Sequence, residues 1–257
     1  MAVDAEIAST IADRVLRKLA LRAAGMSGAD IEFVLKEARQ TARYEKRNLT
    51  LADLEAAFLR RKPARSDLVR FHQACHEAGH AVAHVFLGLG SIEMITINGA
   101  EGASYVDASI DSRCELPTLD LLTKLIVVDL AGRAAEQELC GCLSTGSAGQ
   151  GHSDLARATK RAFDLEMTCG FGSQYPLVYR NVTDPFALLA VNSTLAERVN
   201  QRLEEAYEGA QRIVTQQQRA IKYLAVCLLE DETLEGNSLD VALAEVKDLM
   251  IPAEANA

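Results

Sequence analysis

Two histidines and a glutamate lie within five consecutive residues, in the segment HEAGH at 76–80. Four residues of an α-helix turn through about 400°, so His76 and His80 project from one face and can reach one metal ion. Neutral imidazole nitrogen is a good zinc ligand, and a catalytic zinc keeps one position open for water. Glu77 follows the first histidine and can take the proton of that water as a general base. The spacing therefore predicts hydrolysis of an amide bond at a zinc site.

The rest of the predicted helix supports this interpretation. His72 and His84 continue the histidine face by one turn in each direction, and we interpret them as polar neighbours of the ligands. Alanines and valines between 74 and 85 fall on the opposite face, where they can pack on a core. Gly79 costs about 1 kcal/mol in helix propensity and allows another backbone to approach closely. The competing interpretation is a chance match to H-E-x-x-H on a surface helix.

A third ligand must come from another segment, and three residues qualify. His152 and Asp154 end the Gly- and Ser-rich loop GCLSTGSAGQGHSD at 141–154, and Glu136 lies in LAGRAAEQEL. Asp154 also suits the first turn of a helix capped by Ser153, and Glu136 also suits a solvated helix face. The spacing by itself does not choose among the three.

Composition narrows the fold class and the partners. Hydrophobic residues make up 49% of the 257 positions and aromatic residues 5%, which favours a mainly helical protein with a sizeable core. The net charge of −9 is spread without a basic stripe, so nucleic acid is not expected as a partner. The acidic N-terminus does not read as a signal peptide, and the most apolar run, at 119–132, contains Lys124 and Asp129 and is too short to span a membrane. The six cysteines form no C-x-x-C pair, so we expect mostly small buried residues in a reducing compartment.

The first predicted domain is a small helical unit, residues 1–61. Ser27 with Asp30, and Thr50 with Asp53, match the capping-box pattern at two helix starts. The segment KPARSD, at the end of this unit, has the composition of a linker.

The second predicted domain, residues 62–257, is mainly α with a short β-hairpin or small sheet. A long helix is expected from Ser66 to about Leu87, followed by short strands in 91–98 and 103–110. Further helices are expected at 117–140, 154–169, 195–230 and 238–249.

Several motifs together, in order along nearly the whole chain, resemble the FtsH family of AAA+ ATP-dependent zinc metalloproteases. GMSGADIEFVLKEA resembles the helical lid that ends the family's ATPase domain, and HEAGHAV resembles its zinc motif. LAGRAAEQELCG resembles the helix after the short strands. LSTG…SDLARAT resembles the segment that supplies the third ligand, and CGFG…PLVY the connection that follows. The resemblance implies an AAA lid-like subdomain followed by a zinc peptidase domain.

The resemblance also implies roles for single residues. It implies one Zn²⁺ per subunit, bound by His76, His80 and Asp154, with Glu77 as catalytic base. Glu136 becomes a residue that orients a ligand histidine. His152, which lies two residues before Asp154 in a longer loop, departs from the family pattern. The short strands would present an extended polypeptide substrate by strand addition. The positions near the family's nucleotide pocket are Gly28 and Ala29.

The motifs of this sequence do not include those of an ATPase core. No P-loop of the form G-x-x-x-x-G-K-[ST] occurs in the sequence, so ATP and Mg²⁺ are expected only through an AAA+ ATPase core that this chain lacks. The resemblance implies a homo-hexamer that degrades unfolded or translocated polypeptides. It implies a location in the cytoplasm, or on the cytoplasmic face of the inner membrane if an anchor is present.

Two alternatives are a catalytically inactive assembly or client-binding module of the same fold, and an independent interaction module in 1–61. The region NGAEGASYVDASIDSRCELP diverges from the family, so substrate preference can differ.

Overall fold

The computed structural model describes most of the chain, and its residues divide into two compact units. One unit contains the described residues up to Val69, together with Asn98 and Ser104. The other contains Arg70–Ile97 and the described residues from Tyr105 onward. The described residues are 15–16, 19–20, 22–23, 25–61, 65–98, 104–110, 116–145, 153–180 and 182–252.

The described structure is mainly helical with one small antiparallel sheet, which confirms the predicted fold class. Its helices are α2 (Gly28–Tyr44), α3 (Leu51–Arg61), α4 (Asp67–Phe86), α5 (Leu119–Cys140), α6 (Asp154–Met167), α7 (Pro185–Val191), α8 (Ser193–Gln216), α9 (Gln218–Asp231) and α10 (Gly236–Leu249). Its strands are β1 (Ile92–Thr96), β2 (Tyr105–Ala108) and β3 (Thr233–Glu235).

Helices α2 and α3 begin at the predicted caps. Ser27 accepts a hydrogen bond from the N–H of Asp30, whose carboxylate accepts one from the Ser27 N–H in return. Asp53 likewise accepts a hydrogen bond from the N–H of Thr50 at 2.8 Å. The bonds are reciprocal at the start of α2, whereas at the start of α3 only the Asp53 carboxylate accepts. The small core of this unit consists of Val34, Ala38, Ala57 and Phe58.

The two predicted strands form an antiparallel pair, and a third strand lies on the other side of β1. Met94 of β1 faces Asp107 of β2 and Glu235 of β3, with a register irregularity between Ile92 and Met94. Strand β3 was not predicted, because its three residues lie between two helices and are too few to display an alternating pattern.

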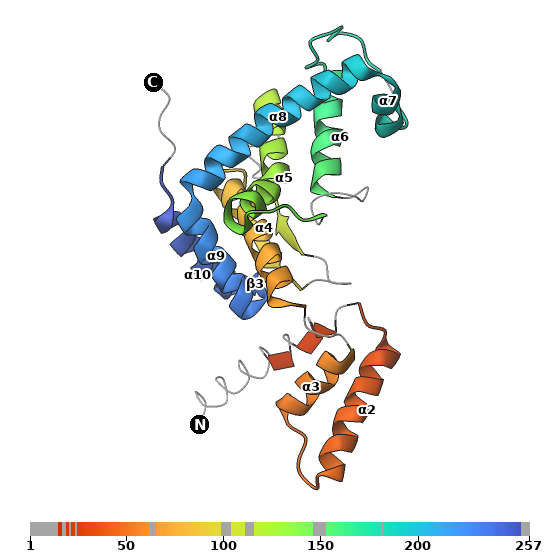
Figure 1. Cartoon of the computed structure of the whole chain (residues 1–257), viewed down its shortest axis with the longest axis vertical. Helices are drawn as coiled ribbons and strands as arrows, with labels where there is room; N and C mark the ends of the chain where they lie inside the picture. Colours follow the sequence, from red (N-terminus) through yellow and green to blue (C-terminus); the bar gives the residue numbers. More distant parts are fainter. Residues whose placement is uncertain are drawn as a thin grey trace. The chain divides into compact units, whose positions relative to one another are not determined.

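The larger core surrounds α5, which packs against α6 and α8 (Figure 1). Nine of the eleven residues from Ile126 to Glu136 are buried, and the other two, Val128 and Arg133, are half-buried. A helix that is enclosed on most sides holds its backbone and side chains in fixed positions. It therefore provides a rigid wall for the neighbouring α4.

Helices α4 and α5 approach closely at Gly79, as predicted. A Cβ atom on Gly79 would lie 2.6 Å from the Ala135 side chain and 2.8 Å from the carbonyl oxygen of Ala131. Carbon atoms in favourable contact lie about 3.5–4.0 Å apart, so a side chain here would push the two helices apart. The glycine thus brings the HEAGH turn against α5.

The predicted helix at 195–230 is wrong in one respect, because Gln217 divides it into α8 and α9. The Gln217 side chain is 1% exposed and binds Ile251, donating to its carbonyl oxygen at 2.7 Å and accepting from its N–H at 2.9 Å. Neither Gly nor Pro marks this break in the sequence. Hydrogen bonds to a distant segment stabilise it, and helical periodicity alone does not reveal them.

The cysteine prediction is largely wrong. Among the described residues only Cys75 is buried, Cys140 and Cys227 are half-buried, and Cys142 and Cys169 are exposed. All five are free thiols.

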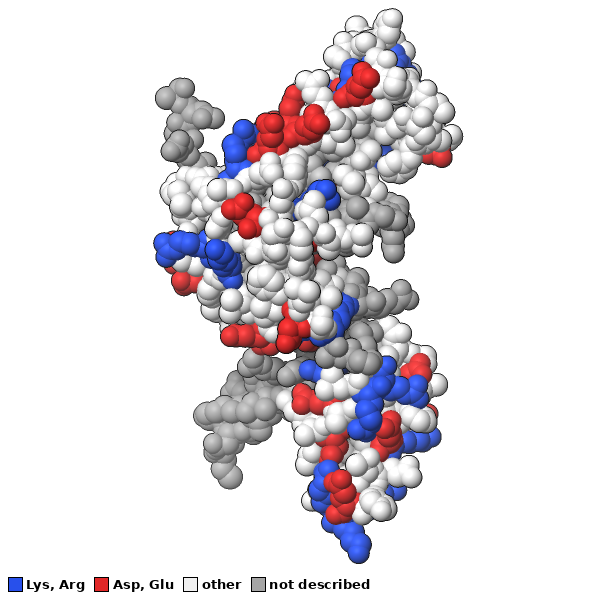
Figure 2. All heavy atoms as spheres, viewed as in Figure 1, with Lys and Arg blue, Asp and Glu red and all other residues white. Residues whose placement is uncertain are grey.

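The described surface carries charges of both signs. Lys and Arg are interspersed with Asp and Glu on the face seen in Figure 2. Over the described ranges, no helix combines the length and the apolar character needed to cross a membrane.

Candidate metal centre

The HEAGH segment lies in the buried part of α4. His76, Glu77 and His80 are 7%, 2% and 6% exposed. The two imidazole rings are nearly perpendicular, at 81°, with their centroids 4.6 Å apart and their Nε2 atoms 3.0 Å apart. Two ring nitrogens at this distance must share a proton or a cation, because facing lone pairs repel each other.

The main chain of α5 sets the orientation of His80. Its Nδ1 donates a hydrogen bond of 2.7 Å to the carbonyl oxygen of Val128. With the hydrogen on Nδ1, the Nε2 atom of a neutral ring keeps its lone pair. That lone pair faces His76 and Asp154. Metal-binding histidines in proteins commonly use this arrangement.

Glu136 of α5 lies on the opposite side of the His76 ring. Its Oε1 is 2.8 Å from Nδ1, although the contact is poorly aligned for a hydrogen bond. Ser144 fixes the carboxylate, because its N–H donates to Oε2 at 2.6 Å and its hydroxyl donates to Oε1 at 3.0 Å. An anion at Nδ1 favours a hydrogen there and leaves Nε2 available to a metal.

Asp154 reaches the same point from the first turn of α6, after its N-cap Ser153. Asp154 Oδ2 lies 2.9 Å from His76 Nε2 and 3.4 Å from His80 Nε2. Neighbouring ligand atoms of a tetrahedral zinc lie about 3.3 Å apart, given bond lengths of about 2.0 Å. The three donors therefore have the chemistry and the spacing to hold one zinc ion. They are the group of metal-ligating side chains that the described residues bring together.

The electrostatics of this centre also suit a cation. Burial raises the pKa of Asp154, but hydrogen bonds with the two histidines outweigh it and hold that pKa well below its usual range. Burial lowers the pKa of His76, yet Asp154 and Glu136 outweigh it and raise the pKa to about 10. A cation that binds at Nε2 would have to displace a proton that this pKa retains on His76.

Gly132 of α5 leaves the space in which the two imidazoles lie. A Cβ atom on Gly132 would lie 2.4 Å from His80 Nε2 and 2.7 Å from His76 Cε1. Both distances are far below van der Waals contact. Only glycine is compatible with the rings in these positions.

The remaining histidines and the two predicted nucleotide-pocket residues stand as follows. His152 lies outside the described residues. His84 is buried, and burial lowers its pKa. Neither His84 nor His72 belongs to the metal-ligating group. Gly28 and Ala29 are the first two residues of α2, in the other unit.

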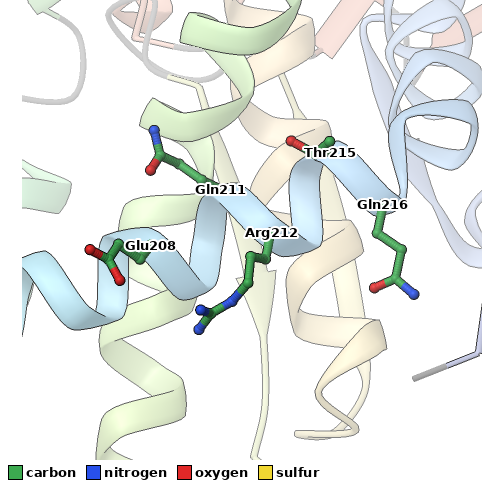
Figure 3. A pocket seen from close by; sticks show the side chains of 5 residues that line it. All are labelled: Glu208, Gln211, Arg212, Thr215 and Gln216. Carbon is green, nitrogen blue, oxygen red and sulfur yellow. The ribbon is translucent and has the colours of Figure 1, made fainter. Parts of the chain in front are cut away.

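A shallow hollow on α8 shares no residue with the metal centre. Among the described residues, the side chains that line it all come from this one helix (Figure 3). The lining residues are Glu208, Gln211, Arg212, Thr215 and Gln216.

Sequence reasoning missed three contributions to the centre. The Val128 carbonyl acts through the backbone and has no sequence signal. Ser144 contacts Glu136 only because the loop folds back. Gly132 did have a signal, since a glycine inside a helical pattern marks a close approach when packing requires it.

Comparison with known proteins places the chain in a peptidase family. Residues 65–241 match peptidase family M41. The ATP-dependent zinc metalloprotease FtsH of Chloroflexus aggregans is 29% identical over 92% of this chain and 39% of its own length. The FtsH of Thermotoga maritima is 31% identical over 90% of this chain and 41% of its own length. The FtsH 3 of Sphaerobacter thermophilus is 33% identical over 89% of this chain and 48% of its own length. The chain thus spans less than half the length of each of these relatives.

Proposed function

The chain belongs to peptidase family M41, and from this premise we propose that it is a zinc-dependent endopeptidase. One observation carries the proposal. His76 Nε2, His80 Nε2 and Asp154 Oδ2 meet within 3.4 Å of one another, nearly enclosed by protein. Three such donors leave a fourth position for water or substrate, as catalytic zinc sites require.

The position of Glu136 supports Asp154 as the third ligand. Glu136 contacts Nδ1 of His76, whereas the candidate ligand atoms converge on Nε2. A carboxylate on the far side of the ring cannot bind the same ion as Nε2. Its proposed role is therefore to orient His76.

Glu77 is the proposed general base. A zinc ion held by the three ligands would polarise a water and the substrate carbonyl. Glu77 takes the proton of the water as its oxygen attacks the peptide carbonyl, and then delivers a proton to the leaving amine. Glu77 is 2% exposed, and this burial keeps bulk water from competing with the transfer.

An extended, unfolded polypeptide is the proposed substrate. Strand β2 lies at an edge of the sheet, with β1 as its partner among the described strands. An edge strand offers backbone N–H and C=O groups to an extended chain. The half-exposed Tyr105 of β2 offers a side-chain contact beside them.

We further propose that the chain works within a larger assembly. The relatives named above are ATP-dependent, and this chain matches less than half of each. In this proposal residues 1–61 are the lid of an AAA+ ATPase core, with Gly28 and Ala29 near its nucleotide, and residues 62–257 are the peptidase. A homo-hexamer would receive polypeptide from the ATPase ring, in the cytoplasm or at the cytoplasmic face of a membrane.

Chelation of zinc is expected to stop cleavage of casein, an unfolded substrate that needs no motor. Zinc removal by 1,10-phenanthroline should reduce the initial rate to background, and added Zn²⁺ should restore it. A non-chelating phenanthroline isomer is the control. Zinc binding without any casein cleavage would favour the inactive assembly module instead.

Substitution of Asp154 by alanine is expected to weaken zinc binding at least about 10-fold, because one of three protein ligands is lost. His152→Ala is the comparison, and it should leave zinc affinity close to that of the wild type. Competition with a chromophoric chelator measures both. The reverse pattern would identify His152 as the third ligand.

A further inference from the structure

Asp129 is a buried carboxylate that the proposed mechanism does not use. It lies in the middle of α5, 5% exposed, in the apolar stretch between Val128 and Leu130. Burial of a carboxylate is unfavourable unless cations and hydrogen bonds compensate for the lost water. An apolar residue would satisfy the packing of α5 at lower cost, so the partners of Asp129 indicate its role.

Two arginines of α6 bind Asp129. Arg161 Nε lies 2.7 Å from Asp129 Oδ2, and Arg157 Nε lies 3.3 Å from Asp129 Oδ1. The arginines are four residues apart and therefore project from one face of α6. Together they attach the first two turns of α6 to the centre of α5.

Arg157 also binds the candidate third ligand. Its Nη2 donates a hydrogen bond of 2.7 Å to Asp154 Oδ1. The guanidinium group is planar and rigid, so attachment of Nε to Asp129 fixes the direction in which Nη2 points. With Oδ1 occupied in this way, Asp154 turns its other oxygen, Oδ2, toward His76 at 2.9 Å.

We propose that Asp129 is a positioning residue for the third zinc ligand and that it acts through Arg157. The inference rests on the proposed function, because it takes Asp154 as a ligand. It gives the buried charge a role in addition to packing. The same turn of α5 then positions two ligands, because the Val128 carbonyl orients His80 and the Asp129 carboxylate orients Asp154.

Zinc affinity in a set of four variants tests the inference. Asp129→Asn and Arg157→Met are each expected to weaken zinc binding about 10- to 100-fold, the usual effect of removing a group that orients a ligand. The double variant should bind zinc as Arg157→Met alone does, because the two residues act in series. Dissociation constants come from competition with a chromophoric chelator, and the melting temperature of each zinc-free variant is recorded alongside.

Arg161→Met is the matched control. It removes an ion pair with the same carboxylate and has a comparable effect on packing, but Arg161 is not the arginine bound to Asp154. Its zinc affinity should stay within about fivefold of the wild type, the usual range for a partly exposed ion pair. A purely structural role of Asp129 would move melting temperatures in all variants and would leave their zinc affinities alike.

The outcomes separate this inference from the proposed function. Unchanged zinc affinity in Asp129→Asn, or additive losses in the double variant, would overturn the inference while the zinc site stands. Absence of zinc binding by the wild type would overturn the proposed function itself. Should Asp129→Asn not fold, equal affinities of Arg157→Met and Arg161→Met would overturn the inference.

Discussion

Replacement of Glu77 by glutamine is expected to reduce the rate of casein cleavage about 100- to 10,000-fold, the usual contribution of a general base. Glutamine keeps the size and shape of the side chain, but its amide does not accept the proton of an attacking water. Glu77 is 2% exposed, so a free buffer base does not readily replace it. The zinc content of the variant should remain that of the wild type, because the ligand atoms are unchanged.

Initial rates and zinc stoichiometry, measured on the same preparations, test this expectation. Glu208→Gln is the matched control, since Glu208 is an exposed glutamate of α8 outside the metal centre. It should leave both quantities unchanged. A fully zinc-loaded Glu77→Gln protein that cleaves casein within tenfold of the wild-type rate would assign the base to another residue.

Replacement of Gly132 by alanine should reduce casein cleavage about 100-fold, through displacement of the ligand histidines. The new methyl group would start 2.4 Å from His80 Nε2 and 2.7 Å from His76 Cε1, so the rings must move by about 1 Å to reach ordinary contact. Zinc sites tolerate departures of only about 0.2 Å in ligand distance, and a misplacement of about 1 Å commonly costs about 100-fold in rate. Zinc affinity should fall together with activity.

Gly209→Ala separates this local effect from a general effect of alanine in a helix. A Cβ atom at Gly209 of α8 would meet Val127 at 3.4 Å, an ordinary contact. That substitution should leave activity unchanged and can add up to about 1 kcal/mol of stability through helix propensity. Melting curves and zinc titrations measure the two effects. Wild-type zinc affinity in Gly132→Ala would show that the rings do not occupy the positions described above.

The helical motif is the part of the site that the sequence predicts best. His76 and His80 share a face because the helix has a fixed period, and Glu77 lies next to the first ligand for the same reason. Local chemistry also predicts the caps at Ser27 and Ser153, since a serine side chain satisfies N–H groups at a helix start. These features depend only on neighbours in sequence.

Contacts between distant segments are the part that spacing does not predict. Asp154 meets His76 across 78 positions of the chain, and Glu136 meets it from a third helix. Which carboxylate faces Nε2 and which faces Nδ1 depends on how α5 and α6 pack, so the residues alone left His152, Asp154 and Glu136 open. The break at Gln217 was missed for the same reason, because a segment remote in sequence stabilises it.

The acceptor that orients His80 is an oxygen of the peptide group, and every amino acid at position 128 supplies it. A scan that replaces residues one at a time would therefore not reveal this contact, because it changes only the side chain, which packs against the core. That contact is lost only when the path of the α5 backbone changes. A proline four residues further along the helix would cause such a change, because its ring would clash with the carbonyl of Val128.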